Sequence, residues 1–332
     1  MLSLILYYID EEYRNLHPYL STRNDDFKVS SDILNLASKN KVLHAFLKGV
    51  LNEGIDTPKV RSELSYCERQ LVKLTDTLQF ISGLLGDNGI DFLTIKTFKG
   101  VPFATQDVDI FIKKTDLKQV QSLLQKRDLQ ETNGKYMKIL TALDLGSPGF
   151  RRHDLLNLDL YTEIPWEGLG SFDHDYLWSN SRWMDLHGIK YRIPNYGADI
   201  LSQLSSALFT DRKITLLDFI YVTSLLKNVN LDELIYQTSK YGWNCQFTKL
   251  ITILHSLRKT IYSNEVIPGK IEFPYTIPIS LLLESIPGTI HHEVMKRPRS
   301  FFSTISKVGF NCFIGNAYVN LKRVANTILI QK

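Results

Sequence analysis

Two aspartates, Asp107 and Asp109, stand two residues apart within the stretch 95–113, IKTFKGVPFATQDVDIFIK. Side chains alternate between the two faces of a β-strand, so both carboxylates share one face, and the apolar Val108, Ile110 and Ile112 share the other. Apolar side chains bury readily, whereas neighbouring carboxylates need a positive partner. A divalent cation bound by oxygen ligands is the simplest such partner, so the pair predicts a site for Mg²⁺ or Mn²⁺.

A third carboxylate, Asp159, stands in a later apolar run over residues 155–161, LLNLDLY. The alternation of side chains places the leucines at even positions on one face and Asp159 on the other. Asp159 is therefore presented on the polar face of an otherwise buried strand. Asp154 and Glu163 are nearby acidic alternatives, because one precedes the apolar run and the other follows it on the same face.

Hydrophobic periodicity predicts the elements that position these acids. Apolar and β-branched residues over 90–95 favour a first strand, and the two aspartates begin a second strand. Before them, apolar residues recur at steps of three and four over 64–85, which predicts a long helix. We favour packing of this stripe within its own domain, and a coiled coil is the alternative. The residues Asp87-Asn88-Gly89 predict a turn that ends the helix.

The order of strand, basic turn and acidic strand resembles the nucleotidyltransferase superfamily, whose members have a DNA-polymerase-beta-like fold. The family pattern is a strand, a small-residue phosphate turn, a further stretch of chain and an apolar-flanked Asp-x-Asp. Here Lys96 and Thr97 stand at the turn, and Asp107-Val108-Asp109 follows. The chain looks most similar to uncharacterised nucleotidyltransferases that have a helical region on each side.

This resemblance implies a two-metal-ion enzyme that transfers NMP from an NTP, such as ATP, to a hydroxyl group and releases pyrophosphate. Asp107 and Asp109 would bridge the two Mg²⁺ (or Mn²⁺) ions. Asp159 would bind the ion on the acceptor side and take the hydroxyl proton. The residues that would face the triphosphate are Lys96, Thr97 and Lys99.

The basic turn departs from the family pattern at position 97, where Gly usually follows Lys. The β-branched Thr97 hinders a close backbone approach to phosphate, and its hydroxyl offers a hydrogen bond instead. Thr105 and Gln106 occupy the position before the acidic pair where relatives often carry a basic or small polar residue. Arg151-Arg152-His153 precedes the later acidic strand, and both a contact with phosphate or acceptor and a solvated loop are open interpretations.

Composition places the chain among ordinary globular proteins. It has 332 residues, 44% hydrophobic and 22% charged, which is comfortable for two domains. A net charge of +4 permits a nucleic acid partner without arguing for one. The cysteines at 67, 245 and 312 lack metal-ligand spacing and are expected to be reduced thiols. With no membrane-length apolar run and no signal-peptide pattern, we expect a cytoplasmic protein that does not bind membranes.

The predicted fold class is α+β, with a small mixed β-sheet forming a nucleotidyltransferase core between N-terminal helices and a C-terminal helical domain. The predicted boundaries are 1–88, 89–195 and 196–332. In the first region we expect short helices over 2–51 and helix caps at Ser30 or Ser31 and at Thr57. In the core we expect Thr115 to cap a helix. Weaker core strands are predicted near 129–131 and 136–140, and a further strand is predicted over 189–193.

The C-terminal region has the pattern of a helical domain. Helices are predicted over 200–208, 214–226, 231–241 and 247–261, and Asp218 on one of them is interpreted as a structural carboxylate. Basic residues interleaved with phenylalanines over 296–323 invite a nucleic acid interpretation, but helix packing beside surface charge is favoured. His291-His292 is not expected to bind metal.

Two other functions stay open. An Asp-x-Asp glycosyltransferase fits less well, because its apolar strand usually precedes the acidic pair and here the apolar run follows it. A non-catalytic nucleotide-binding protein, or one that binds a protein partner as in a toxin–antitoxin pair, is the main alternative, and Thr97 favours it. The acceptor, whether a small molecule, RNA, a protein or a sugar, is not specified by a metal motif, and neither are base preference and oligomeric state.

Overall fold

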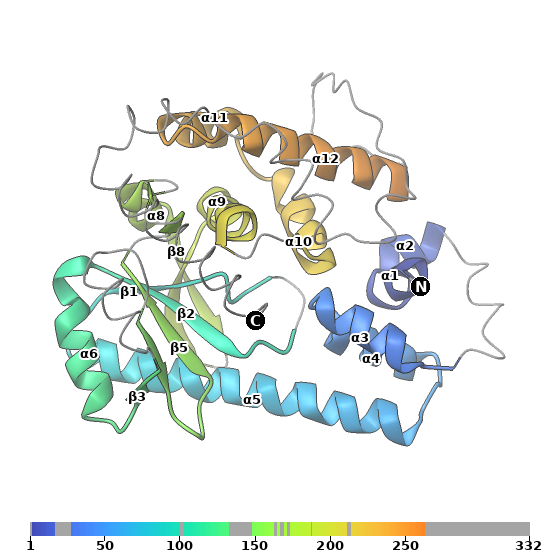
Figure 1. Ribbon diagram of the computed structural model, residues 1–332, viewed down its shortest axis with the longest axis horizontal. Helices are drawn as coiled ribbons and strands as arrows, with labels where there is room; N and C mark the ends of the chain where they lie inside the picture. The colour runs from blue at the N-terminus through green and yellow to red at the C-terminus, as the bar shows by residue number, and fades with distance from the viewer. Residues whose placement is uncertain are drawn as a thin grey trace, which may run out of the picture.

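The structure is a computed structural model that describes residues 2–16, 28–99, 103–132, 148–162, 165–166, 169–170, 173–186, 188–210 and 214–262. It is a mixed α+β fold with a small mixed sheet, as the sequence predicts. One long helix, α5 (Pro58–Gly86), runs along the molecule, with the sheet over one end and the N-terminal helices over the other (Figure 1).

The N-terminal region consists of short helices, as predicted: α1 (Leu2–Ile9), α2 (Glu11–Leu16), α3 (Ser31–Lys39) and α4 (Leu43–Asn52). Ser30 caps α3, because its hydroxyl oxygen accepts a hydrogen bond of 3.3 Å from the backbone N–H of Ile33. Thr57 caps α5 in the same way, and Pro58 occupies the first helical turn, where a missing N–H is harmless.

Helix α5 contributes to two hydrophobic clusters. Near its start, Val60 and Cys67 pack with the N-terminal helices. Near its end, Leu78 and Ile81 pack with the sheet. The apolar stripe of α5 therefore packs against other parts of the same chain, as the sequence analysis favours over a coiled coil. The helix ends at the predicted turn, where Gly89 has a φ of 66°, a value that glycine adopts without strain.

The main sheet has the order β1-β2-β5-β4-β3. Its edge strands are β1 (Phe92–Ile95) and β3 (Gln130–Glu131), and its inner strands are β2 (Asp107–Ile112), β5 (Asn157–Tyr161) and β4 (Gly149–Arg151). Strand β2 runs antiparallel to β1 and parallel to β5. The strand predicted near 136–140 lies outside the described residues.

The predicted helix after β2 exists, but its predicted cap was wrong. Residues Lys114–Asp116 form a 3₁₀ turn, and α6 (Leu117–Gln125) begins only after it, with no side-chain cap. Thr115 lies inside this turn, so its hydroxyl is one residue too early to reach the free N–H groups of the helix. It donates instead to Asp116 Oδ1 at 3.0 Å.

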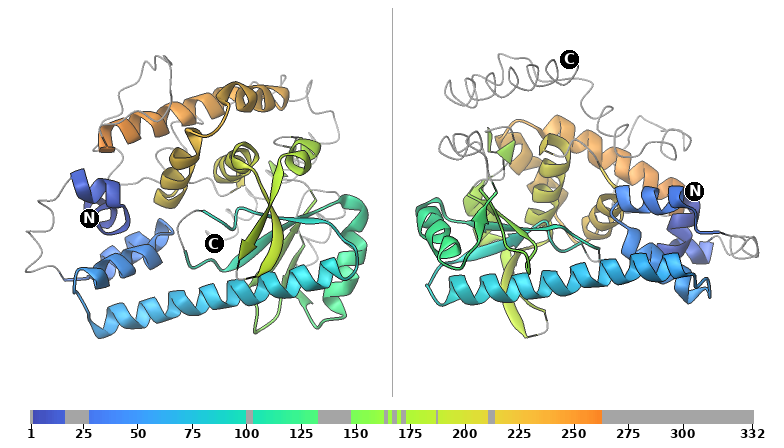
Figure 2. Two further views of the ribbon diagram at one scale, coloured as in Figure 1. Left: turned by 180° about the vertical axis from the view of Figure 1, so that it is seen from behind. Right: turned by 60° about the horizontal axis from the view of Figure 1, so that its bottom comes forward.

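A hairpin of β8 (Ser181–Leu186) and β9 (Ile189–Pro194) packs beside β1 and crosses α5 (Figures 1 and 2). The strand β9 was predicted, whereas β8 was not, because it is half exposed and lacks a run of apolar residues. The short helix α8 (His174–Ser179) precedes the hairpin, and β6 (Pro165–Trp166) pairs with β7 (Leu169–Gly170).

The chain then continues as helices, as predicted: α9 (Tyr196–Ser205), a π-helical turn (Ser206–Thr210), α10 (Leu216–Leu226), α11 (Leu231–Lys240) and α12 (Asn244–Tyr262). Their apolar side chains, including Leu217 and Phe247, share one cluster with Phe46 and Leu47 of α4. The residues 263–332, including His291-His292 and the basic aromatic tail, lie outside the described part of the chain. In that described part, no helix has the length and apolar character needed to cross a membrane.

The contact between α4 and α1 generates a prediction about Gly49. A Cβ at Gly49 would lie 2.0 Å from the carbonyl oxygen of Tyr8, which is backbone and cannot swing away. We expect Gly49→Ala to lower the free energy of unfolding by about 2–3 kcal/mol, because the two helices must separate. The measurement is urea denaturation followed by circular dichroism.

The matched control is Gly83→Ala in α5, where an added Cβ meets no atom within 4 Å. Because alanine favours a helix over glycine, this change should raise stability by about 0.5–1 kcal/mol. If both substitutions changed stability equally, the close approach of α4 to α1 would be contradicted.

Candidate functional site

The polar face of β2 and β5 opens into a cavity of about 290 Å³ between the sheet and the surrounding helices. The residues that the sequence predicts for the site all line it: Lys96, Thr97, Lys99, Asp107, Asp109 and Asp159. The structure thus brings together residues that span 64 positions of the chain, from 96 to 159 counted inclusively.

The acidic alternatives are placed elsewhere. Asp154 is exposed and forms a bidentate pair with Arg152, with N···O distances of 2.7 and 3.0 Å. Neither residue lines the cavity. Glu163 lies outside the described residues. Asp159 is therefore the carboxylate of its strand that shares a cavity with Asp107 and Asp109.

Strand register explains how the carboxylates meet. In the parallel pairing of β2 with β5, Asp109 lies directly opposite Asp159, and Asp107 lies opposite Asn157. Residues in register on neighbouring strands share a face, so Asp109 and Asp159 point to the same side. On the other face Val108 and Ile110 are fully buried, which prevents the strand from turning over.

Lys96 is the cation nearest to these carboxylates in the described structure. Its Nζ lies 3.3 Å from Asp109 Oδ2 and donates a hydrogen bond of 3.3 Å to the hydroxyl of Tyr161. The ammonium also lies 4.3 Å from the centroid of the Tyr161 ring. Lys96 has a φ of 56°, a left-handed conformation that non-glycine residues rarely adopt and that occurs often at functional sites.

Burial and mutual repulsion change the acidity of the carboxyl groups. Burial raises the pKa of Asp109, the charge of Asp107 raises it further, and Lys96 opposes both. Burial, followed by the charges of Asp109 and Asp107, raises the pKa of Asp159 to about 6. Lys96 therefore does not fully compensate for burial and for the neighbouring negative charges, and an added cation would stabilise the ionised carboxylates.

The two threonines of this region are engaged within the protein. Thr97 is buried, and its hydroxyl donates to the carbonyl oxygen of Ile95 at 3.0 Å. Thr105 Oγ1 donates to the backbone carbonyl and to Oδ1 of Asp107, at 2.9 and 3.1 Å. Thr105 therefore orients the Asp107 carboxylate, whereas the proton of Thr97 is directed toward its own turn.

Lys99 forms a buried ion pair with Asp218 of α10. The Nζ–Oδ1 distance is 2.5 Å, and the side chains are 5% and 7% exposed. Asp218 also closes the capping box of α10 with Thr215, as a structural carboxylate would. Burial alone would raise the pKa of Asp218, but the charges of Lys99 and Lys41 and its hydrogen bonds hold it below its ordinary value.

Sequence reasoning missed other residues that line the cavity: Lys41, Phe103, Gln203, Ser206 and Ala207. Lys41 lies between α3 and α4, and Gln203 lies on α9, so no local pattern connects them to the aspartates. Tyr161 was also missed as a site residue. Its position two residues after Asp159 on the same strand is a signal that could have found it.

The donor set fits a hard divalent cation. Asp107, Asp109 and Asp159 supply carboxylate oxygens, and Lys96 offsets part of their charge. Among the described residues, no group of three or more His, Cys, Asp or Glu side chains is close enough to hold a metal ion by itself. Mg²⁺ is usually bound by one or two carboxylates together with substrate phosphates, and the residues present suit that mode.

A second buried carboxylate, Asp199 of α9, lies behind the cavity wall. It accepts a hydrogen bond from the hydroxyl of Tyr221 and a bond of 3.4 Å from Gln203, which lines the cavity. Burial raises the pKa of Asp199 to about 6, although these hydrogen bonds and the charge of Lys99 act in the opposite direction.

Comparisons of the chain with protein-family models, with curated proteins and with solved structures find no match.

The buried ion pair between Lys99 and Asp218 predicts that Lys99→Met destabilises the fold. Removing the ammonium leaves Asp218 ionised and buried without its partner, which should lower the free energy of unfolding by about 3–5 kcal/mol. The double substitution Lys99→Met with Asp218→Asn should recover part of this loss. The measurement is urea denaturation of the single and double variants.

The matched control is Lys113→Met, which breaks the exposed pair with Asp91, whose N···O distance is 3.2 Å. Exposed ion pairs contribute little to stability, so Lys113→Met should change the free energy of unfolding by no more than about 1 kcal/mol. Equal losses for Lys99→Met and Lys113→Met would contradict the buried pair.

The raised pKa of Asp199 predicts a pH-dependent stability. Since its pKa is about 6 in the folded state and about 3.8 when unfolded, its contribution is full below pH 3.8 and is lost as pH rises through 6. The stability of the wild type relative to Asp199→Asn should therefore fall by about 2 kcal/mol between pH 4 and pH 7. Urea denaturation of both proteins across this pH range measures their difference in free energy of unfolding. A difference that stays constant or rises with pH would show that the pKa of Asp199 is not raised in the folded protein.

Proposed function

We propose that this protein is a metal-dependent nucleotidyltransferase that transfers NMP from an NTP to a hydroxyl group of an acceptor and releases pyrophosphate. The observation that carries the proposal is the convergence of Asp107, Asp109 and Asp159 in one cavity with Lys96. Carboxylates without sufficient compensating charge, facing a basic turn, suit a ligand that brings both divalent cations and phosphates.

The sheet arrangement supports this proposal. The acidic pair begins a central strand, and the third acid lies on its parallel neighbour, in register with Asp109. A small mixed sheet with helices before and after it is also the architecture that the sequence resemblance implies. We therefore propose the described part of 89–195 as the nucleotidyltransferase core.

The residues of the chain would act as follows. Asp107, held by Thr105, and Asp109 would bind the cations. Lys96 would move its ammonium from Asp109 toward the triphosphate once the cations neutralise that carboxylate. Asp159 would accept the proton of the acceptor hydroxyl as a general base.

The bound Mg²⁺ or Mn²⁺ ions would supply charge stabilisation of the triphosphate and activation of the acceptor hydroxyl. Asp107, Asp109 and Asp159 are the residues that would hold them.

Nucleotide binding without turnover is a second candidate, and two observations favour it. The hydroxyl proton of Thr97 is engaged with Ile95, and the ammonium of Lys99 is paired with Asp218, so two of the three predicted phosphate-binding groups already have partners within the protein. Retained metal-dependent NTP binding without transfer would identify this function.

The test is label transfer from each α-³²P-labelled NTP with Mg²⁺ or Mn²⁺, offering RNA, cell lysate and the protein itself as acceptors. We expect transfer by the wild type, reduced about 100-fold or more in Asp107→Asn, Asp109→Asn and Asp159→Asn, because each substitution removes charge from the reacting centre. The matched control is Asp154→Asn, which lies outside the cavity and should transfer label normally.

The outcomes separate the candidates. No transfer, together with Mn²⁺-dependent NTP binding that the three cavity variants lose, would identify a binding protein. Transfer that all three cavity variants retain would contradict the assignment of the site.

A further inference from the structure

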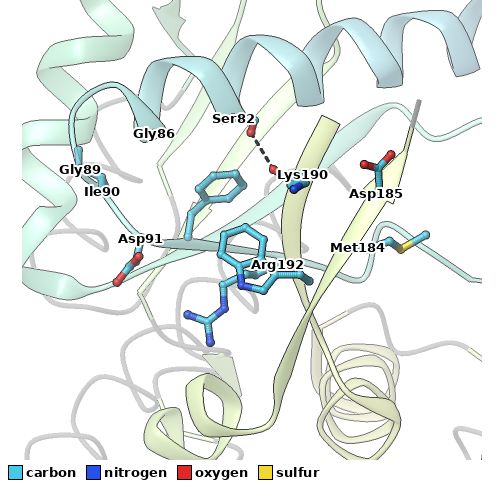
Figure 3. Close-up of a pocket in the computed structure, with 11 residues that line it drawn as sticks. Ser82, Gly86, Gly89, Ile90, Asp91, Met184, Asp185, Lys190 and Arg192 are labelled. Atoms are coloured by element: carbon cyan, nitrogen blue, oxygen red, sulfur yellow. Dashed lines mark hydrogen bonds between the residues drawn. The ribbon is translucent and has the colours of Figure 1, made fainter. Parts of the chain in front are cut away.

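A second cavity, of about 720 Å³, lies between the end of α5, the start of β1 and the β8–β9 hairpin (Figure 3). None of its lining residues lines the carboxylate cavity. Its volume is within the range of about 300–1,000 Å³ that is typical of small-molecule sites. The function proposed above makes no use of it.

The apolar part of this cavity is aromatic and open. Trp183 of β8 lines it and is 69% exposed, the most exposed large hydrophobic residue in the described part of the chain. Phe92 of β1 and Met184 of β8 line it as well. On the α5 side, Gly86 has no atom within 4 Å of where its Cβ would be, so a flat group can approach the helix closely.

The acidic groups of the cavity are already engaged. Asp91 pairs with Lys113, with an N···O distance of 3.2 Å. Asp185 accepts a hydrogen bond of 2.8 Å from the backbone N–H of Gly188 at the tip of the hairpin. Asp91 is therefore compensated by a lysine, whereas Asp185 keeps its negative charge and lies opposite Lys190 in the register of the hairpin.

The basic groups of the cavity are Lys190 and Arg192. Among the described residues, neither Lys190 nor Arg192 of β9 forms a salt bridge with a carboxylate. Arg192 uses Nη2 to donate to Ser181 Oγ and to the carbonyl oxygen of Trp178, at 2.5 and 3.2 Å, and its guanidinium lies 5.9 Å from the centroid of the Trp183 ring. Its remaining N–H groups, and the ammonium of Lys190, can bind an anion.

We propose that this cavity binds a planar aromatic ring that carries an anionic group, with the ring against Trp183 and the anion at Lys190 and Arg192. An aromatic surface next to a fixed guanidinium suits both parts of such a ligand. The inference is independent of the proposed nucleotidyl transfer, since it rests on different residues. The same chemistry is found in mononucleotides and in aromatic acids without a nucleoside, and the experiment distinguishes these two sources.

The probe is 1-anilinonaphthalene-8-sulfonate (ANS), a planar aromatic anion, titrated by fluorescence into the full-length protein. Its uncharged counterpart N-phenyl-1-naphthylamine is titrated in parallel. We expect saturable binding of ANS at one site and weaker binding of the neutral probe. Lys190→Gln should weaken ANS about tenfold, as expected for a lost charged hydrogen bond, and leave the neutral probe unchanged.

The decisive pair of variants uses two glycines of the same helix. Gly86→Leu fills the cavity and should weaken both probes about tenfold or more. Gly83→Leu places the same side chain where a Cβ also meets no atom but outside the cavity, and should bind as the wild type does. Melting temperatures of both variants confirm that they are folded.

The source of the natural ligand is tested by displacing ANS with AMP and with 1-naphthoate. Displacement by AMP indicates a nucleotide, and displacement by 1-naphthoate alone indicates an aromatic acid. The proposal is overturned if Gly86→Leu binds ANS as well as Gly83→Leu does, or if neither compound displaces the probe. It is also overturned if Asp159→Asn, in the other cavity, abolishes the binding of ANS.

Discussion

The burial of the apolar face of β2 against α5 is the interaction on which the candidate site depends. Val108 and Ile110 are buried with Leu78 and Ile81 of α5, so this face of the strand cannot turn toward water. The alternation of the strand then places the acidic pair on the opposite face. The same helix fixes the neighbouring strand, because the backbone N–H of Leu156, next to β5, donates to Thr77 Oγ1 at 2.9 Å.

This arrangement places like charges next to one another. Asp109 and Asp159 are opposed in register with Asp107 nearby, and Lys96 compensates only part of their charge. Carboxylates that lie opposite each other on neighbouring strands destabilise a sheet. A cation that binds both of them would therefore also stabilise the folded protein. Lys96 has a left-handed backbone conformation that lysine does not prefer, so the surrounding structure must hold it in place.

Local patterns were sufficient to predict much of this geometry. The alternation in the two acidic strands placed Asp107, Asp109 and Asp159, and the helical stripe, its Thr57 cap and its Gly89 turn were also found. Contacts between distant segments could not be predicted, because no periodicity connects Lys41 to the sheet or Lys99 to Asp218. The strand β8 escaped prediction for another reason: its exposed side chains give no hydrophobic alternation, although Trp183 then lines a cavity.

The most direct test of the central claim is an anomalous difference map from crystals grown with Mn²⁺ and a non-hydrolysable NTP analogue. We predict metal peaks about 2.0–2.2 Å from carboxylate oxygens of Asp107, Asp109 and Asp159. We also predict that the ammonium of Lys96 contacts a phosphate of the analogue in place of Asp109. Nucleotide or Mn²⁺ bound away from these aspartates, with the Lys96–Asp109 pair intact, would contradict it.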